Sequence, residues 1–187
     1  MLGRWRTDLC CASVALCILA SAGVPTKSFA QTADATGRAS ATVIEPLRAA
    51  LIADLSFGYV ATKTPSNGTV SIDALTGAVV SQNVDRTGCS KEGCTPHPAL
   101  FAVYGEPEAN FRVETAKTLI AVHSEDESAT LPVSAIHSAV AGSIVPGSGT
   151  IGRDGTTEVI IGGTLQVRSG QKRGVYTAKP LITLVYE

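Results

Sequence analysis

The C-terminal stretch of the chain reads GGTLQVRSGQKRGVYTAKPLITLVYE and spans residues 162–187. Apolar side chains occupy alternate positions in its two halves, at Leu165, Val167, Ile182, Leu184 and Tyr186. Alternation with a period of two places such residues on one face of a β-strand. The basic stretch SGQKRG predicts an exposed turn between two long strands, Thr157–Val167 and Val175–Tyr186. Pro180 lacks a backbone donor, so that part of the last strand is expected at an edge or a bulge.

The rest of the chain repeats this pattern at short intervals. Turn-forming pairs such as Asn67-Gly68 and Asp154-Gly155 separate alternating apolar segments. Further strands are predicted at Ser40–Glu45, Ala50–Val60, Thr69–Ala74, Ala78–Val84, Ala99–Tyr104, Asn110–Glu114, Thr118–His123 and Ala135–Ala141. A short helix over Pro46–Asp54 is the one alternative reading. Many short strands with short connections predict an all-β, immunoglobulin-like antiparallel β-sandwich.

The same alternation predicts which side chains form the core. They are Val43, Leu55, Phe57, Val70, Ile72, Phe101, Val103, Leu165, Val167, Ile182 and Leu184. The 187 residues suit one domain, and 44% of them are hydrophobic, which is too many for a mainly disordered chain. The formal net charge of -1 gives no reason to expect a nucleic-acid partner, because such partners require a basic face.

The N-terminus has the order of a secretory signal peptide. Arg4 and Arg6 precede the apolar run LCCASVALCILASAGV, and the small residues of SFA end at Ala30. We expect cleavage between Ala30 and Gln31, which makes residues 1–30 a signal peptide. A permanent membrane anchor is the alternative, but the apolar run is shorter than the roughly 18 residues needed to span a bilayer. The sequence therefore predicts an exported protein of the periplasm, cell surface or extracellular space, with residues 31–38 as a flexible leader and 39–187 as one sandwich domain.

Two cysteines remain after the signal peptide, Cys89 and Cys94 in TGCSKEGCTPHP. Export implies an oxidising compartment, in which such a pair forms a disulfide. A zinc site with His97 is the alternative, although the spacing supplies no clear fourth ligand. The short loop predicts a smaller stabilisation than the ~2–4 kcal/mol typical of disulfides.

The remaining residues give no catalytic or cofactor motif. His97, His123 and His137 lie on separate segments without metal-ligand spacing, and Glu125-Asp126-Glu127 lacks the ordered spacing of a calcium loop. Neither a nucleophile elbow nor a phosphate-binding glycine loop is present. We therefore expect no enzyme activity, no metal and no cofactor; a secreted enzyme is the least favoured alternative.

Three blocks together resemble a known family. They are LSFGYV at Leu55–Val60, ALFAVYGEPEANFRV at Ala99–Val113 and the C-terminal stretch already quoted. This combination resembles the bacterial domain of unknown function 4402 (DUF4402), a family of small exported proteins. The resemblance runs from about Ala41 to Tyr186 and implies a pilin-like β-sandwich with no established activity. The segment around Cys89 and Cys94 departs from the family pattern and is expected to be a local surface decoration.

A more distant similarity is to fimbrial subunits that a chaperone and an usher assemble. Those subunits carry a penultimate tyrosine and a glycine at the fourteenth position from the C-terminus, which match Tyr186 and Gly174. The similarity implies an assembly strand with Gly174, Tyr176, Ile182, Leu184 and Tyr186, completed by a strand from another chain. The leader QTADATGR has few apolar residues, so donation would have to use ATVI at Ala41–Ile44, which is also predicted as the first strand of the body.

These observations predict a secreted or cell-envelope, non-enzymatic protein whose partner is unknown. A fimbria-like subunit that assembles by donor-strand addition is the alternative. Its expected partners are other envelope or fimbrial proteins or a periplasmic chaperone.

Overall fold

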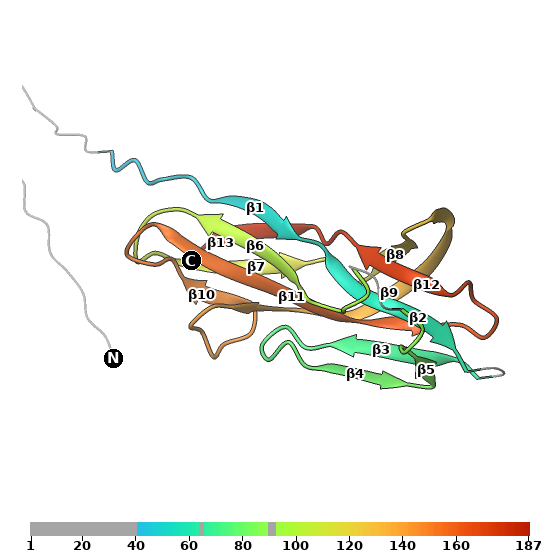
Figure 1. Cartoon of the computed structure of the whole chain (residues 1–187). Helices are drawn as coiled ribbons and strands as arrows, with labels where there is room; N and C mark the ends of the chain where they lie inside the picture. The colour runs from blue at the N-terminus through green and yellow to red at the C-terminus, as the bar shows by residue number, and fades with distance from the viewer. Residues whose placement is uncertain (1–40, 64–65, 90–92) are drawn as a thin grey trace, which may run out of the picture. The chain divides into compact units, whose positions relative to one another are not determined.

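Antiparallel strand pairing organises the whole of the body, Thr42–Glu187 (Figure 1). The computed structural model describes residues 41–63, 66–89 and 93–187. The strands are β1 (Arg48–Ala53), β2 (Leu55–Thr62), β3 (Gly68–Ile72), β4 (Val79–Gln82), β5 (Val84–Asp85), β6 (Ala99–Tyr104), β7 (Asn110–Thr115), β8 (Leu119–His123), β9 (Asp126–Val140), β10 (Ser148–Thr150), β11 (Thr156–Val167), β12 (Gly174–Ala178) and β13 (Ile182–Tyr186). The predicted all-β fold is confirmed, and no helix occurs among the described residues.

Two sheets form the sandwich. The larger sheet has the order β1-β6-β11-β9-β8-β12-β2-β5, and β3 joins it by pairing with β11 and carries β4. The smaller sheet has the order β10-β7-β13. The long strand β11 joins three other strands of the larger sheet. Its first half pairs with β6, its second half pairs with β3, and β9 pairs along its other edge.

The core lies between the sheets and contains most of the predicted side chains. Eight of the predicted residues are buried: Leu55, Phe57, Val70, Ile72, Phe101, Val103, Leu165 and Val167. Ile182 and Leu184 are only partly buried against this cluster. The prediction for Val43 is wrong, because its side chain is 93% exposed. Alternation identifies the inward face of a strand, but Val43 belongs to no strand and therefore has no inward face.

The predicted first strand, Ser40–Glu45, is wrong over its described residues. Residues 41–47 form no strand, and Pro46 interrupts backbone pairing there. The alternative helix over Pro46–Asp54 is also wrong, since Arg48–Ala53 is the strand β1. The predicted strand Ala50–Val60 is two strands that separate at Asp54, so that β1 pairs with β6 and β2 pairs with β12.

The predicted last strand, Val175–Tyr186, is wrong as one strand: it is two, β12 and β13, and neither pairs with β11. β12 pairs with β2 and β8 in the larger sheet, whereas β13 pairs with β7 in the smaller one. The connection Lys179-Pro180-Leu181 carries the chain from one sheet to the other. Pro180 has no N–H to continue a ladder, which explains why a continuous β-pattern breaks at this point.

The predicted strand Ala135–Ala141 corresponds, apart from Ala141, to the second part of a longer strand, β9. β9 begins at Asp126, directly after the β8 turn, and it pairs first with β8 and then with β11. The predicted signal peptide, its cleavage point at Ala30 and Gln31, and the leader 31–38 lie outside the described residues. Within the described part of the chain, no helix is long and apolar enough to cross a bilayer.

Candidate functional site: the open side between β1 and β13

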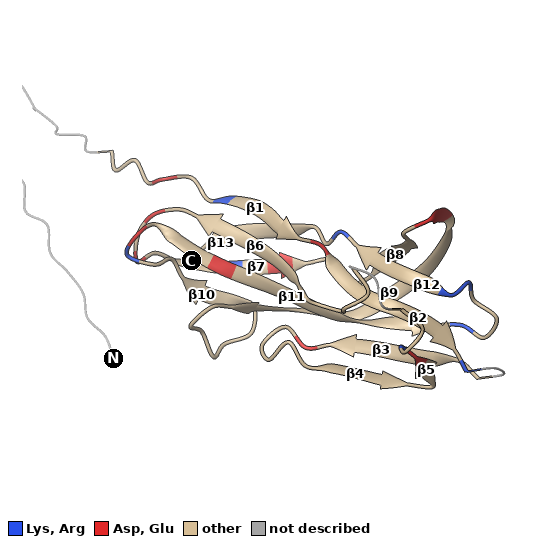
Figure 2. Cartoon of the chain, viewed as in Figure 1, with Lys and Arg blue, Asp and Glu red and all other residues tan. Residues whose placement is uncertain are grey.

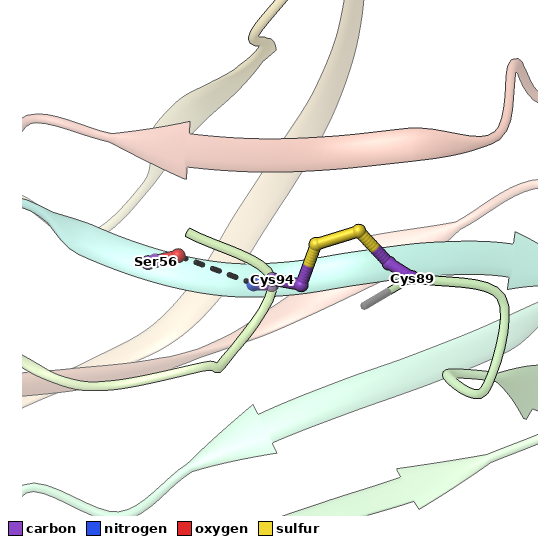
Figure 3. Close-up of a disulfide and its surroundings, with 4 residues drawn as sticks. Ser56, Cys89 and Cys94 are labelled. Carbon is purple, nitrogen blue, oxygen red and sulfur yellow. Dashed lines mark hydrogen bonds between the residues drawn. A yellow bond between two sulfur atoms is a disulfide. The ribbon is translucent and has the colours of Figure 1, made fainter. Parts of the chain in front are cut away.

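The predicted disulfide between Cys89 and Cys94 is confirmed, with Cα atoms 6.0 Å apart (Figure 3). The pairing uses both thiols, which removes the thiolate ligands that a zinc site would need. The segment after Cys94 is not a loose decoration. The carbonyl of Cys94 accepts a 3.1 Å hydrogen bond from the N–H of Tyr59, and Ser56 and His97 exchange two backbone hydrogen bonds of 2.9 and 3.0 Å. Residues 94–97 therefore cover the outer edge of β2 at Ser56–Tyr59.

Gly58 makes this close approach possible. It has a φ of 66°, and a β-carbon at this position would overlap the carbonyl oxygen of Cys94. A residue other than glycine is strained in this conformation, and its side chain would displace Cys94 and Pro96. The LSFGYV block thus carries a local structural requirement at its glycine.

The five residues of the predicted assembly strand are divided between two strands and two sheets. Gly174 and Tyr176 lie on β12, whereas Ile182, Leu184 and Tyr186 lie on β13. Tyr176 is fully buried and its hydroxyl donates to the carbonyl of Lys172 at 2.7 Å. It therefore belongs to the core of the larger sheet and faces no partner.

Tyr186 fastens the end of β13 to two other segments. Its hydroxyl donates to the carbonyl of Glu45 at 2.6 Å and accepts from the N–H of Glu106 at 2.7 Å. Gly105 gives this hydroxyl room, because a β-carbon there would lie 2.6 Å from it and 2.9 Å from Cδ2 of Leu47. The end of β13 and the residues before β1 thus lie together.

The strand β1 is the last strand of the larger sheet and is poorly covered on both faces. Its register pairs Ala49 with Val103 and Leu51 with Phe101. Directly paired residues share a face of the sheet, so Ala49 and Leu51 are on the core side. Val103 and Phe101 are buried, yet Leu51 is 42% exposed and Ala49 is also exposed. The side chains that bury the core face of β6 therefore do not extend over β1.

The strand β13 shows the same loss of cover at the end of the smaller sheet. Ile182 and Leu184 pair with Thr115 and Val113, and both are only half-buried although they face the core. We call the incompletely covered, core-facing residues of these two edge strands, Ala49, Leu51, Ile182 and Leu184, the open side. Six of the twelve exposed large apolar side chains of the described residues belong to these two edge strands or to the segments just before them, within residues 43–52 and 181–185.

The outer edge of β13 also presents unpaired backbone groups. The N–H of Glu187 bonds to the carbonyl of Asn110 on β7 at 3.0 Å. Backbone groups of an antiparallel strand alternate in direction, so those of Val185 and Thr183 also face β7, while those of Leu184 and Ile182 face away. No strand of the described residues pairs with that outer edge.

The open side carries little charge. Most charged residues of the described chain lie in the turns, with a few on strands such as β7 (Figure 2), and β13 contains none. Arg48 is the one charged residue of β1. Natural proteins block exposed strand edges with charges, prolines or covering loops, because a bare edge pairs with other chains. The open side has no charge on β13 and only Arg48 at the start of β1, whereas the outer edge of β2 is covered.

The three histidines lie apart and make separate contacts. His123 is buried; its Nδ1 accepts from the N–H of Glu125 at 3.0 Å, and its Nε2 lies 3.1 Å from the carbonyl of Arg173. His137 contacts Ala74, and His97 lies beside Pro98. No group of three potential metal ligands occurs in the described ranges. Sequence reasoning missed the contact between Asp73 and His137, whose Oδ2 and Nε2 atoms lie 3.7 Å apart.

Comparison with known proteins gives one match. The family model described as "Domain of unknown function (DUF4402)" matches residues 47–186. No curated protein and no solved structure matches the chain.

Proposed function

The chain belongs to the DUF4402 family, and on this premise we propose that it is an exported, non-enzymatic β-sandwich protein of the cell envelope. Its activity is association with another chain by strand addition at the open side. The observation that carries this proposal is the burial gradient across both sheets. Paired neighbours such as Phe101 and Val113 are buried, while the adjoining Leu51 and Leu184 are not.

Strand addition suits both chemical features of this surface. An added strand gains hydrogen bonds to the outward backbone groups of Ile182 and Leu184, and its side chains cover Leu51 and Ala49. The backbone bonds supply affinity and the apolar contacts select the partner. The signal-peptide pattern that ends at Ala30 supports an envelope location, where such a partner is available.

Export is tested with the full chain expressed in a bacterial host. We expect the mature protein in the periplasmic or extracellular fraction, with an N-terminus at Gln31 by mass spectrometry. Retention of the uncleaved chain in the cytoplasm or in the inner membrane would refute the proposed location.

Association is tested with the exported protein and a second copy of itself as the partner. Leu51→Lys places a charge where an added strand would pack, and Val80→Lys is the matched control because Val80 is also an exposed apolar residue on a terminal strand, β4. We expect sedimentation equilibrium to show self-association that Leu51→Lys weakens and Val80→Lys does not. A monomer at every concentration, or equal effects of both variants, would contradict the proposal.

A fimbria-like subunit is the second candidate, and one observation favours it. Ala41–Ile44 is not part of the body's sheets, and Val43 and Ile44 are 93% and 52% exposed. This segment therefore remains available to add to the open side of the next copy. Val43→Asp distinguishes the two candidates, because it abolishes association only if Ala41–Ile44 is the added strand.

A further inference from the structure

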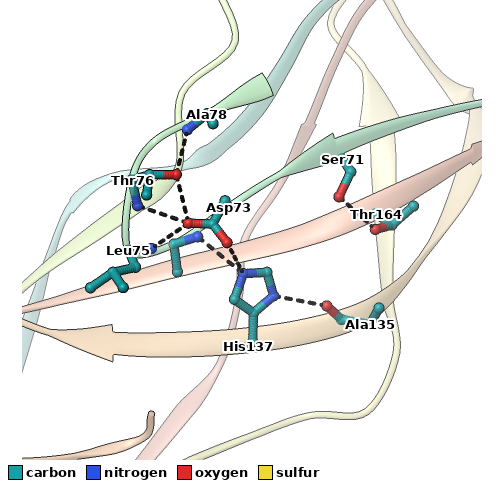
Figure 4. A network of polar contacts seen from close by, with 9 residues as sticks. Ser71, Asp73, Leu75, Thr76, Ala78, Ala135, His137 and Thr164 are labelled. Carbon is teal, nitrogen blue, oxygen red and sulfur yellow. Dashed lines mark hydrogen bonds and ion pairs between the residues drawn. The ribbon is translucent and has the colours of Figure 1, made fainter. Parts of the chain in front are cut away.

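A small recess separate from the open side lies between the turn after β3 and the loop after β9. It has a volume of ≈ 170 Å³, and its wall contains Asp73, Leu75, His137, Ile144 and Val145. Figure 4 shows Asp73 and Leu75 in the turn and His137 beneath them on β9. The sequence places these groups far apart, and the pairing of β11 with both β3 and β9 brings them together.

The backbone of β9 is bent to position His137. The register between β9 and β11 shifts between Gly162 and Thr164, and Ala135 has a φ of 50°, which is unusual for a residue with a β-carbon. Bulges of this kind re-aim side chains. The carbonyl of Ala135 lies 3.0 Å from Nδ1 of His137, and the N–H of Ala74 donates to Nε2 at 3.0 Å. Nε2 is therefore the acceptor of this hydrogen bond, which orients the imidazole toward the turn.

Gly162 of β11 is part of the same arrangement. A β-carbon there would lie 2.7 Å from the N of Ala74 and 3.0 Å from Cε1 of His137. Glycine therefore lets β11 pass directly beneath the contact between the turn and the imidazole. The contact between the turn and His137 therefore depends on the turn after β3, the bulge in β9 and the glycine in β11.

Asp73 contributes a carboxylate with one occupied oxygen and one available oxygen. Oδ1 accepts from the N–H groups of Leu75 and Thr76 and from the hydroxyl of Thr76 at 3.1, 2.8 and 2.8 Å. These hydrogen bonds, above all that from the Thr76 hydroxyl, lower the pKa of Asp73, so the group is ionised at neutral pH. Oδ2 lies 3.7 Å from Nε2 of His137. Within the described part of the chain, no lysine or arginine pairs with Asp73.

The rim of the recess is apolar. Leu75, Ile144 and Val145 are 66%, 95% and 56% exposed. At ~30 Å³ for each small group in a condensed phase, the recess holds about five or six non-hydrogen atoms. This is the size of an unbranched butylammonium group.

We propose that this recess binds a lysine side chain of a partner polypeptide. Its ammonium group contacts Oδ2 of Asp73, and its methylene groups lie against Leu75 and Val145. A lysine fits better than an arginine because the planar guanidinium prefers both oxygens of a carboxylate, and Oδ1 is already occupied. A polypeptide is favoured over a free amine because the exposed rim, above all Ile144, extends beyond the lysine and would be covered by the residues that flank it.

The test is NMR titration of the exported protein with three peptides: acetyl-valyl-lysyl-valine amide, its norleucine analogue and its arginine analogue. We expect saturable shifts of the amides of Ala74, Leu75 and Val145 with the lysine peptide. The norleucine peptide, which lacks the charge, is expected to bind about tenfold more weakly or worse, and the arginine peptide also more weakly. Butylammonium alone is the probe for a free amine and is expected to bind more weakly than the lysine peptide.

Asp73→Asn is the principal variant, and Asp85→Asn is its matched control. Asp85 accepts from the N–H and the hydroxyl of Thr87 in the same way, but it is not part of the recess. Ile144→Ser tests the rim at a position too exposed to affect folding. We expect Asp73→Asn and Ile144→Ser to weaken the lysine peptide and Asp85→Asn to leave it unchanged. No saturable shifts, equal binding of norleucine, or equal binding of butylammonium would each overturn the proposal.

Discussion

Gly174 lies against the imidazole of His123, so closely that a β-carbon at Gly174 would overlap Nε2 of the ring. The two residues come from the neighbouring strands β12 and β8. The ring also packs edge-on to Tyr176, with centroids 5.2 Å apart. The glycine that resembles a fimbrial assembly position is therefore required by a buried histidine of the same chain.

Gly174→Ala is expected to lower the free energy of unfolding by about 2–4 kcal/mol, from overpacking and from an unfavourable φ of 150°. Urea denaturation measures this change. The matched control is Gly77→Ala, at a glycine with a φ of 68° and no atom near its missing β-carbon. Equal losses in the two variants would mean that the contact with His123 contributes nothing.

Tyr186→Phe removes the hydroxyl that joins Glu45 and Glu106 to the end of β13. Loss of two hydrogen bonds is expected to lower the free energy of unfolding by about 1–2 kcal/mol. Hydrogen exchange at the amide of Glu106 should become faster. Tyr104→Phe is the control, because Tyr104 is 40% exposed, and a similar loss in this control would argue against a specific role for the Tyr186 hydroxyl.

Hydrogen bonds from Lys172 and then Ser128 lower the pKa of Asp126 to about 2. The folded-state pKa lies below the ordinary 3.8, so the stabilisation is present above pH 4 and is lost as the pH falls to about 2. The difference in stability between the natural protein and Asp126→Asn should therefore close over this range. NMR titration of the Asp126 carboxyl group should show a low midpoint that Lys172→Met raises, and an unchanged midpoint would exclude the role of Lys172.

Removing the disulfide is expected to lower the free energy of unfolding only modestly. The cysteines are separated by five positions, and loop-closure entropy for so short a loop predicts a loss of about 2 kcal/mol. The double variant Cys89→Ser/Cys94→Ser, followed by urea denaturation, measures it. Thiol counting on the denatured natural protein, without reductant, should find both cysteines oxidised, and two reactive thiols would refute the bond.

Alternation predicted the strands that are covered on one face and paired on both sides. Ala99–Tyr104 matches β6 at both ends, because its odd-numbered residues face the core. Alternation fails to predict structure where the pairing of a segment depends on strands far away in the sequence. It does not show that Val43 has no neighbouring strand, or that the chain changes sheets at Pro180.

The candidate sites were less predictable than the fold. Gly174 and Tyr186 were selected from a resemblance, whereas their contacts with His123 and Glu45 join segments far apart in the sequence. The recess depends on Ala74 meeting His137 across 63 positions. The sequence feature near Asp73, an aspartate three residues before a threonine, is common to many turns and does not by itself indicate a recess. The recess forms only because β11 pairs with both β3 and β9.

The bond between Tyr186 and Glu45 also governs how the body responds to tension. Because Glu45 meets Tyr186, the start of β1 and the end of β13 lie at adjacent points. Pulling these points apart peels β1 from β6 and β13 from β7 one hydrogen bond at a time, instead of shearing all of these bonds at once. A fibre built from this protein would therefore have to carry its load through contacts other than the two ends of each chain.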